Sequence, residues 1–406
     1  MLTERKVVGK CKQIEQRYDA LRYAALEPLA MGLWETREHF RALPAQAELE
    51  PIAKGTEWGG DDVTGWFAGT VELPAACAGQ RVFLRAATGG ETLFFVNGEP
   101  RGVFDENHPV VMLVDQAVAG AKLDIALEAY AGREIPGTQP NEKARRQPGV
   151  SRRFEGVELV LERRDVADFV FDLRTLNQLY GALGEHSLRR GKVLNALREV
   201  FVAVDSLPEE HDESHWRPKL AEARAIMAPL LALTNSPTTP WFGLTGHSHI
   251  DTAWLWPLAE TWRKCARTFS SVLTLMEQYP EFRFIQSSPC QTAVIRREYP
   301  ALYRRIEAAV AAGRWEPNGA MWVEPDCNIP SGEAFARQLL HGQQATREMF
   351  GYTADTLWLP DVFGYSAALP QLLQLAGVEF FCTTKISWND STRFPYDSFV
   401  WHGLDG

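Results

Sequence analysis

The sequence predicts an α+β protein of several domains, with an N-terminal antiparallel β-sandwich, a helical connector and a C-terminal α/β unit. Its 406 residues exceed what one typical domain needs. Short alternating apolar runs dominate from about residue 55, helical spacing replaces them at Val166, and strand-like and helix-like runs alternate beyond a Pro- and Thr-rich stretch at 235–240. These changes divide the chain into residues 1–50, 51–165, 166–235 and 236–406.

Residues 1–50 are mixed and partly helical. Apolar residues recur at helical spacing over residues 17–33, interrupted by Pro28, which favours a helix packed against another domain. Residues 51–165 form the predicted β-sandwich, since short alternating runs are separated by clusters of Gly, Asn and Asp. Asn97-Gly98 predicts a hairpin turn between two of these strands, because both residues tolerate positive φ.

Residues 166–235 predict three helices, with Ser206-Leu-Pro208 separating the second from the third. In residues 236–406 the alternation of strands and helices is typical of a parallel sheet or barrel. Strands are predicted at 241–245, 282–286, 314–315, 356–359 and 380–383. Helices are predicted at 258–278, 293–312, 331–350 and 368–376, with Ser331 as an N-cap.

Composition excludes several classes of partner. The formal net charge of −10 argues against nucleic acid, because a net acidic chain gains nothing from a phosphate backbone. There is no run of about 18 apolar residues, so no membrane span is expected. The six cysteines are widely spaced, which indicates free thiols in a reducing compartment, and the first residues lack an apolar signal core. We therefore expect a cytoplasmic protein; its homo-oligomeric state stays open.

A first polar motif, Gly246-His-Ser-His-Ile-Asp251, directly follows a predicted strand. Reactive groups in α/β folds lie in the loops after strand ends. In an extended segment His249 and Asp251 point to the same side, and an imidazole with a carboxylate suits a divalent metal such as zinc. In the same extended segment His247 points to the same side. It is either a third metal ligand or a residue that supports the ligands. An isolated His-x-Asp is more often a loop without a ligand role, but the strand end and the Trp254–Trp256 pair favour a site.

Two further segments carry candidate groups. Asp361 follows the strand predicted at 356–359, within Trp358-Leu-Pro-Asp-Val-Phe-Gly, and could bring a third ligand to the same face. A lone Asp in such a position is more often a cap or turn residue. Glu324 and Asp326, next to Trp322, are typical of a polar substrate loop, and equally of residues that accept backbone hydrogen bonds near a helix start.

Several long motifs occur together and in order. They are His247-Ser-His-Ile-Asp-Thr-Ala-Trp-Leu-Trp, Trp322-Val-Glu-Pro-Asp-Cys-Asn-Ile-Pro-Ser-Gly-Glu, Trp358-Leu-Pro-Asp-Val-Phe-Gly-Tyr-Ser, Arg263-Lys-Cys-Ala-Arg and Lys385-Ile-Ser-Trp. From about residue 240 onward the chain resembles glycoside hydrolase family 38, most of all the cytosolic, vacuolar and bacterial α-mannosidases. A weaker similarity covers residues 89–99 of the β-region.

The resemblance implies a seven-stranded β/α barrel-like catalytic domain behind the β-sandwich. It implies that His249, Asp251 and Asp361 bind zinc, with cobalt as an alternative metal. It further implies that Asp361 is the nucleophile of a retaining mechanism, that Trp254 stacks beneath the sugar and that Phe363 lies beside the nucleophile. The expected substrate is a mannose-containing oligosaccharide or a small α-mannoside.

In the family a further zinc-binding His and the acid/base Asp lie later than residue 406, and His402 does not match that ligand motif. We therefore expect a part of a longer protein that binds metal weakly and catalyses poorly alone.

Two alternative functions stay open. His247-x-His249 after a strand is also typical of amidohydrolase-like metal hydrolases, although His341 falls inside a predicted helix. The β-region could also be a carbohydrate-binding module attached to an inert domain.

Overall fold

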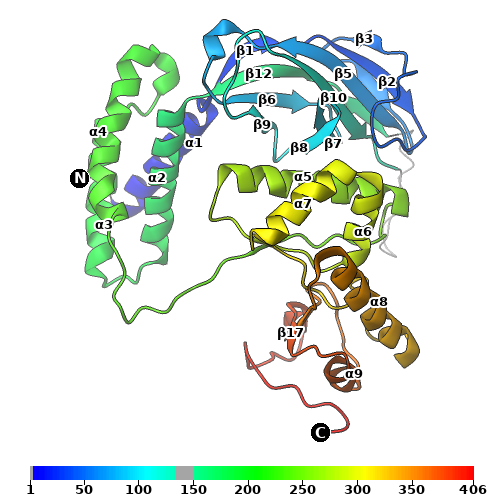
Figure 1. The fold of residues 1–406 in the computed structure, drawn as a ribbon. Coiled ribbons are helices and arrows are strands. Elements are labelled where there is room, and N and C mark those ends of the chain that lie inside the picture. The colour runs from blue at the N-terminus through cyan, green and yellow to red at the C-terminus, as the bar shows by residue number, and fades with distance from the viewer. Residues whose placement is uncertain (1–2, 134–149) are drawn as a thin grey trace.

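The computed structural model describes residues 3–133 and 150–406. Residues 134–149 of the predicted sandwich range lie outside the described residues. In the described parts, a β-sandwich lies above an α/β unit, and a helical bundle stands beside both (Figure 1).

Two antiparallel sheets form the sandwich, in the orders β1-β12-β6-β9 and β3-β2-β5-β10-β7-β8. Its strands are β1 (Tyr23–Pro28), β2 (Met31–Thr36), β3 (Glu50–Ile52), β5 (Thr64–Glu72), β6 (Val82–Ala87), β7 (Glu91–Val96), β8 (Glu99–Phe104), β9 (Val110–Val114), β10 (Lys122–Tyr130) and β12 (Gly156–Glu162). A small pair, β4 (Glu57–Gly59) with β11 (Ser151–Arg153), lies beside them. Buried residues such as Phe67, Phe94 and Leu127 form its core, which confirms the predicted antiparallel β-sandwich.

The hairpin turn predicted between two strands is confirmed. Asn97 and Gly98 connect β7 to β8 with φ of 50° and 81°, the left-handed values that this dipeptide tolerates. The helix predicted over residues 17–33 is wrong beyond residue 20. The chain leaves α1 (Glu4–Ala20) and forms β1 and β2, because pairing of β1 with β12 and of β2 with β5 satisfies the backbone there. Pro28, which cannot donate a backbone hydrogen bond, lies at the end of β1.

The three helices predicted after Val166 are confirmed as α2 (Arg164–Ala182), α3 (Leu188–Ala203) and α4 (Glu213–Leu231). A short 3₁₀ turn at Pro208–Glu210 separates the last two. The first helix α1 packs among them, since Tyr18 contacts the rings of Phe169 and Trp216 edge-on at 5.2 and 5.5 Å between centroids. Residues of α1 therefore share one hydrophobic core with residues of α2, α3 and α4.

The α/β unit contains β13 (Gly246–His247), α5 (Leu258–Gln278), β14 (Phe284–Ile285), α6 (Pro289–Glu298), α7 (Pro300–Ala311), β15 (Trp315–Glu316), α8 (Gly332–Phe350), β16 (Thr356–Trp358), α9 (Leu369–Leu375) and β17 (Phe380–Cys382). All its strand pairs are parallel, as predicted. In the described residues the five strands make one sheet of three and one of two, not a single closed barrel. Ser331 caps α8, because its side chain accepts a hydrogen bond from the Ala334 backbone.

Two predicted elements of this unit differ from the structure. The strand predicted at 241–245 is wrong, because only Gly246 and His247 pair with β14, while Trp241 and Phe242 are exposed. The single helix predicted at 293–312 is divided into α6 and α7. Pro300 starts the second helix, and the residue before a proline is disfavoured in the helical conformation; Tyr299 accordingly has φ −132° and ψ 65°.

Helix α5 joins the sandwich to the α/β unit, and Figure 1 shows it beneath β7 and β8. Apolar residues of both parts, including Trp66, Phe95 and Phe269, form one core. Within this interface Arg263 is fully buried, and its Nη1 donates to Thr64 Oγ1 at 2.6 Å and to Glu128 Oε1 at 3.2 Å.

The same guanidinium pairs with a carboxylate of its own helix, since Arg263 Nη2 lies 2.6 Å from Glu260 Oε2. Glu260 also binds Arg267, which reaches Glu91 of β7 at 3.1 Å. An ion network of α5, β5, β7 and β10 therefore fixes the first turns of α5, and with them the loop 248–257 that precedes the helix.

All six cysteines are free thiols, and five of them are buried. Within residues 3–133 and 150–406, no helix has the length and apolarity needed to cross a membrane.

Replacing Arg263 with Met is expected to lower the free energy of unfolding by about 3–5 kcal/mol, because Glu128 would lose its buried ion pair and Glu260 would keep only Arg267. Urea denaturation measures this loss. The control is Arg337→Met, which removes an exposed ion pair with Glu333 on α8 and should cost less than about 1 kcal/mol. Equal losses in the two variants would contradict a structural role for the network.

Candidate metal centre

The first two candidate ligands lie in the loop that follows β13. The strand ends at His247, so His249 and Asp251 lie just beyond its carboxyl end, as in other α/β sites. Gln291 of α6 donates to the backbone carbonyl of Ile250 at 2.7 Å and holds the loop between the two residues. Their side chains are partly exposed, so the loop presents them to solvent from a fixed backbone.

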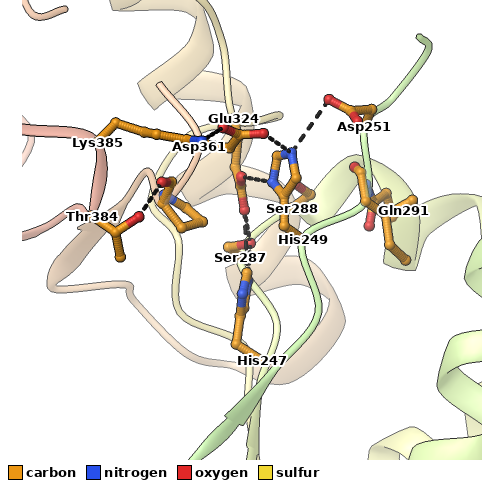
Figure 2. Close-up of polar contacts among 12 residues, drawn as sticks. His247, His249, Asp251, Ser287, Ser288, Gln291, Glu324, Asp361, Thr384 and Lys385 are labelled. Atoms are coloured by element: carbon orange, nitrogen blue, oxygen red, sulfur yellow. Dashed lines mark hydrogen bonds and ion pairs between the residues drawn. The ribbon is translucent and has the colours of Figure 1, made fainter. Parts of the chain in front are cut away.

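Asp361 comes from the other parallel sheet, in the loop after β16. Thr384, which follows β17, donates to the backbone carbonyl of Pro360 at 2.7 Å. This hydrogen bond fixes the residue immediately before Asp361. The ends of β13 and β16 thus carry the three predicted ligands toward one another (Figure 2).

One ligand atom from each of His249, Asp251 and Asp361 lies within 4.8 Å of the other two. The Nε2 atom of His249 is 3.3 Å from Asp251 Oδ1 and 3.4 Å from Asp361 Oδ2. Metal bonds of about 2.0–2.2 Å at tetrahedral angles separate two ligand atoms by roughly 3.3–3.6 Å. The two separations from His249, and the three donor types, therefore suit a zinc-like cation.

Glu324 contacts Nδ1 of the His249 ring, while Nε2 faces the two aspartates. Its side chain is only 7% exposed, and its Oε2 is 2.5 Å from His249 Nδ1. Ser287 donates to its other oxygen, and His247 Nε2 is 3.1 Å from Ser287 Oγ and 3.6 Å from Glu324. A carboxylate on Nδ1 makes that atom the N–H donor and leaves Nε2 as the atom available to a metal.

The electrostatics of the site reflect an excess of negative charge. The hydrogen bond to Glu324 raises the pKa of His249 to about 9, against the effect of burial, and the charges of Glu324 and Asp251 add to the rise. Burial would raise the pKa of Glu324, but hydrogen bonds from His247, His249 and Ser287 outweigh it and lower that pKa. A group of carboxylates that holds a proton on imidazole so firmly also attracts a divalent cation in its place.

Lys385 also lies at this centre, although in the sequence it carries only a family motif and no predicted site role. Its ammonium lies 2.7 Å from Asp361 Oδ1, on the carboxylate oxygen that does not face His249, and 3.3 Å from the centre of the Trp388 ring. The only signal in the sequence was the short motif that begins at Lys385. Ser287 was also missed, because nothing in its local pattern indicates a contact with Glu324.

The remaining predicted residues lie around this centre in different ways. Trp254 and Phe363, at 66% and 67% exposure, are large aromatic surfaces open to solvent. Trp254 contacts Trp256 edge-on at 5.5 Å between ring centroids. Asp326 is exposed and accepts hydrogen bonds from the backbone of Asn328 and Ile329, both at 2.8 Å, which lower its pKa. It shapes its own loop and is not part of the metal group.

Comparison with known proteins assigns the two large parts of the chain. Residues 242–406 match the glycosyl hydrolases family 38 N-terminal domain, and residues 31–154 match the alpha-mannosidase jelly roll domain. Every residue of the candidate metal centre falls inside the first match. Residues 155–241, which include most of the helical bundle, lie outside both. The matches confirm the resemblance inferred from the motifs.

Individual relatives agree with the domain matches. The chain is 33% identical over 366 residues to alpha-mannosidase 2C1 of Mus musculus, which covers 89% of this chain and 34% of that protein. It is 45% identical over 173 residues to alpha-mannosidase G of Dictyostelium discoideum, a match that covers 43% of this chain and 16% of that protein. It is 44% identical over 162 residues to the alpha-mannosidase of Saccharomyces cerevisiae, which covers 40% of this chain and 15% of that protein. The chain spans about a third of the length of the mouse relative.

Replacing Glu324 with Gln is expected to lower the pKa of His249 from about 9 toward its ordinary value of 6.5, because the charged acceptor on Nδ1 is lost. A His whose pKa is raised by folding stabilises the fold fully below pH 6.5, and loses that contribution as pH rises through 9. Glu324→Gln should therefore destabilise the metal-free protein at pH 6 more than at pH 10.

Nuclear magnetic resonance titration of the His249 ring measures the pKa, and denaturation at both pH values measures the stability. Asp326→Asn is the matched control, since it removes a carboxylate of the same loop that does not touch His249. An unchanged His249 pKa in Glu324→Gln would contradict the assigned contact.

Proposed function

We propose that this chain, which carries the family 38 N-terminal domain over residues 242–406, forms the metal-binding and nucleophile-bearing part of a retaining α-mannosidase active site. The observation that carries the proposal is the convergence of His249, Asp251 and Asp361 within 4.8 Å, inside the matched domain. Relatives that match 40–89% of the chain are named α-mannosidases, so the proposed substrate is a mannose-containing oligosaccharide or a small α-mannoside.

His249 Nε2, Asp251 and Asp361 Oδ2 would hold zinc, or cobalt as an alternative. The donor set supports this assignment, because imidazole with carboxylates suits both ions and leaves positions open for substrate oxygens. When bound, the cation would supply Lewis-acid and templating chemistry toward two neighbouring sugar hydroxyls. Glu324 acts on the site through His249, since it holds the ring with Nε2 directed at the two aspartates.

Asp361 is the proposed nucleophile. It would attack the anomeric carbon and form a covalent mannosyl-enzyme, while a second carboxylic acid at about 5–5.5 Å would protonate the leaving oxygen and then activate water. Two contacts support the role: Lys385 binds Asp361 Oδ1 and restricts the rotation of the carboxylate, and Thr384 holds the backbone carbonyl of Pro360. A nucleophile with restricted rotation loses less entropy on reaching the attack geometry.

The sugar would rest on exposed aromatic rings. Trp254 follows Asp251 by three residues and Phe363 follows Asp361 by two, so each ring accompanies a ligand in its loop. Their exposure supports a stacking role, since both rings are open to contact with a sugar. Asp326, in the loop before α8, is also proposed as a substrate contact.

The wider assignments are also part of the proposal. The parallel pairs β13–β14, β14–β15 and β16–β17 support membership of a seven-stranded β/α barrel-like catalytic domain. Six free thiols support a reducing compartment such as the cytoplasm. An amidohydrolase-like centre is not favoured, because His247 is engaged by Ser287 and His341 lies within α8.

A mannosyl fluoride carrying a second fluorine on its ring is expected to label Asp361 covalently. Fluoride leaves without protonation, so labelling needs the nucleophile but not the general acid. Mass spectrometry of peptides should find one added sugar on the segment around Asp361, and none after Asp361→Asn. Labelling with the corresponding glucosyl fluoride tests sugar selectivity. A sugar attached elsewhere would contradict the role of Asp361.

Crystals soaked in Zn²⁺ are expected to give an anomalous peak at the zinc edge, at about 2.0–2.2 Å from His249, Asp251 and Asp361. Chelation should remove the peak, and His249→Ala should prevent it, whereas His341→Ala on α8 should leave it unchanged. Absence of a peak with the three side chains pointing apart would refute the metal site in this chain.

A further inference from the structure

A second group of metal-ligating side chains lies in the helical bundle, outside both family matches. Asp205 follows α3, His211 follows the short 3₁₀ turn, and His215 lies in the first turn of α4. One ligand atom of each lies within 4.8 Å of the other two. The rings of His211 and His215 are 4.6 Å apart between centroids, and His215 Nε2 is 3.6 Å from Asp205 Oδ1. None of these residues contacts the centre at His249.

A protein cation already occupies the point where two of these groups meet. The Nζ atom of Lys219, one helical turn after His215, is 2.9 Å from both oxygens of Asp205 and 3.0 Å from His215 Nε2. An ammonium group can only donate hydrogen bonds, so His215 Nε2 must be the acceptor. The lone pair of His215 and the carboxylate of Asp205 are therefore both directed at a position that holds a positive charge.

We propose that Asp205, His211 and His215 form a binding site for a divalent transition-metal cation of the zinc and cobalt class. Two imidazoles and one carboxylate select such ions over magnesium and calcium, which prefer oxygen ligands. Lys219 is 31% exposed and has a flexible stem, so its ammonium can turn into solvent when the metal takes its place. His211 and His215 are exposed, so the metal can enter directly and keep water at its open positions.

The surroundings indicate a structural role for this site. Glu209, in the turn between Asp205 and His211, pairs with Arg17 at the end of α1. Trp216, next to His215, packs against Tyr18 of α1. A metal bound to residues 205, 211 and 215 would tie the α3–α4 connection to the first turn of α4, where α1 also packs. Binding to the folded state alone stabilises the bundle by mass action.

The test uses the full chain without a histidine tag, in the His249→Ala background, so that the centre proposed for catalysis does not contribute. Titration with Co²⁺, followed by its visible absorption and by calorimetry, should show one equivalent bound. Adding His215→Ala should weaken binding at least tenfold. Adding Lys219→Met should strengthen it, because the competing ammonium is gone. Lys192→Met, an exposed lysine of α3, is the matched control and should change nothing.

Zn²⁺ should also raise the melting temperature of His249→Ala, but not that of the protein carrying His249→Ala and His215→Ala together. Circular dichroism establishes that each variant is folded. Absence of Co²⁺ binding in His249→Ala would overturn the site, as would binding that His215→Ala leaves unchanged or that Lys219→Met weakens. These outcomes are independent of the proposed mannosidase function, because no residue is shared between the two sites.

Discussion

The buried guanidinium of Arg263 is the interaction on which the arrangement of the α/β unit depends. It lies in the first turns of α5 and reaches across the interface to Thr64 and Glu128 of the sandwich. A buried charge tolerates few alternative positions, because any shift leaves it or its partners without compensation in a medium of low polarity. We infer that this network, whose contacts are directional, sets the register of α5 more strictly than its apolar contacts do. The sandwich therefore acts as a fixed support for the loop that carries His249 and Asp251.

The metal centre likewise depends on polar contacts that fix the positions of its side chains. Each ligand is held by a hydrogen bond to its own ring or to the neighbouring backbone: Glu324 on the His249 ring, Gln291 on Ile250, and Thr384 on Pro360. These contacts come from α6, from the loop before α8 and from the end of β17, so several separate elements must fold before the site exists. Ligands held in advance require less ordering when the cation arrives.

The candidate ligands could be predicted because they depend on a local rule. Polar residues after strands lie at one edge of a parallel sheet, and this rule makes His249, Asp251 and Asp361 candidates while it leaves His247 open. The ligand roles themselves are what the resemblance to family 38 implies. For Glu324 the sequence leaves a substrate contact and an acceptor of backbone hydrogen bonds equally open, because it does not show the contact with His249, 75 residues earlier. Lys385 could not be assigned for the same reason, since its contact with Asp361 depends on the position of β17.

Fold errors also had physical causes. Helical spacing in residues 17–33 is real, but pairing with β12 and β5 satisfies the backbone of that segment better than a helix interrupted by Pro28. Likewise, apolar character at Trp241 and Phe242 indicated a strand, yet only the next pair of residues finds a partner in β14. Sequence periodicity indicates the secondary structure that a segment favours alone, whereas strand pairing depends on segments far away in the sequence.

The two proposed cation sites differ in how their charge is balanced. This difference should determine which of them binds a metal ion first. Around His249 there are three carboxylates, those of Asp251, Asp361 and Glu324, against one lysine. Around His215 the carboxylate of Asp205 is matched by Lys219. A unit charge about 4 Å from another contributes roughly 4 kcal/mol at an effective dielectric constant of 20. The first site offers an uncompensated negative charge to a dication and the second must first release an ammonium, so metal should fill the site at His249 before the one at His215.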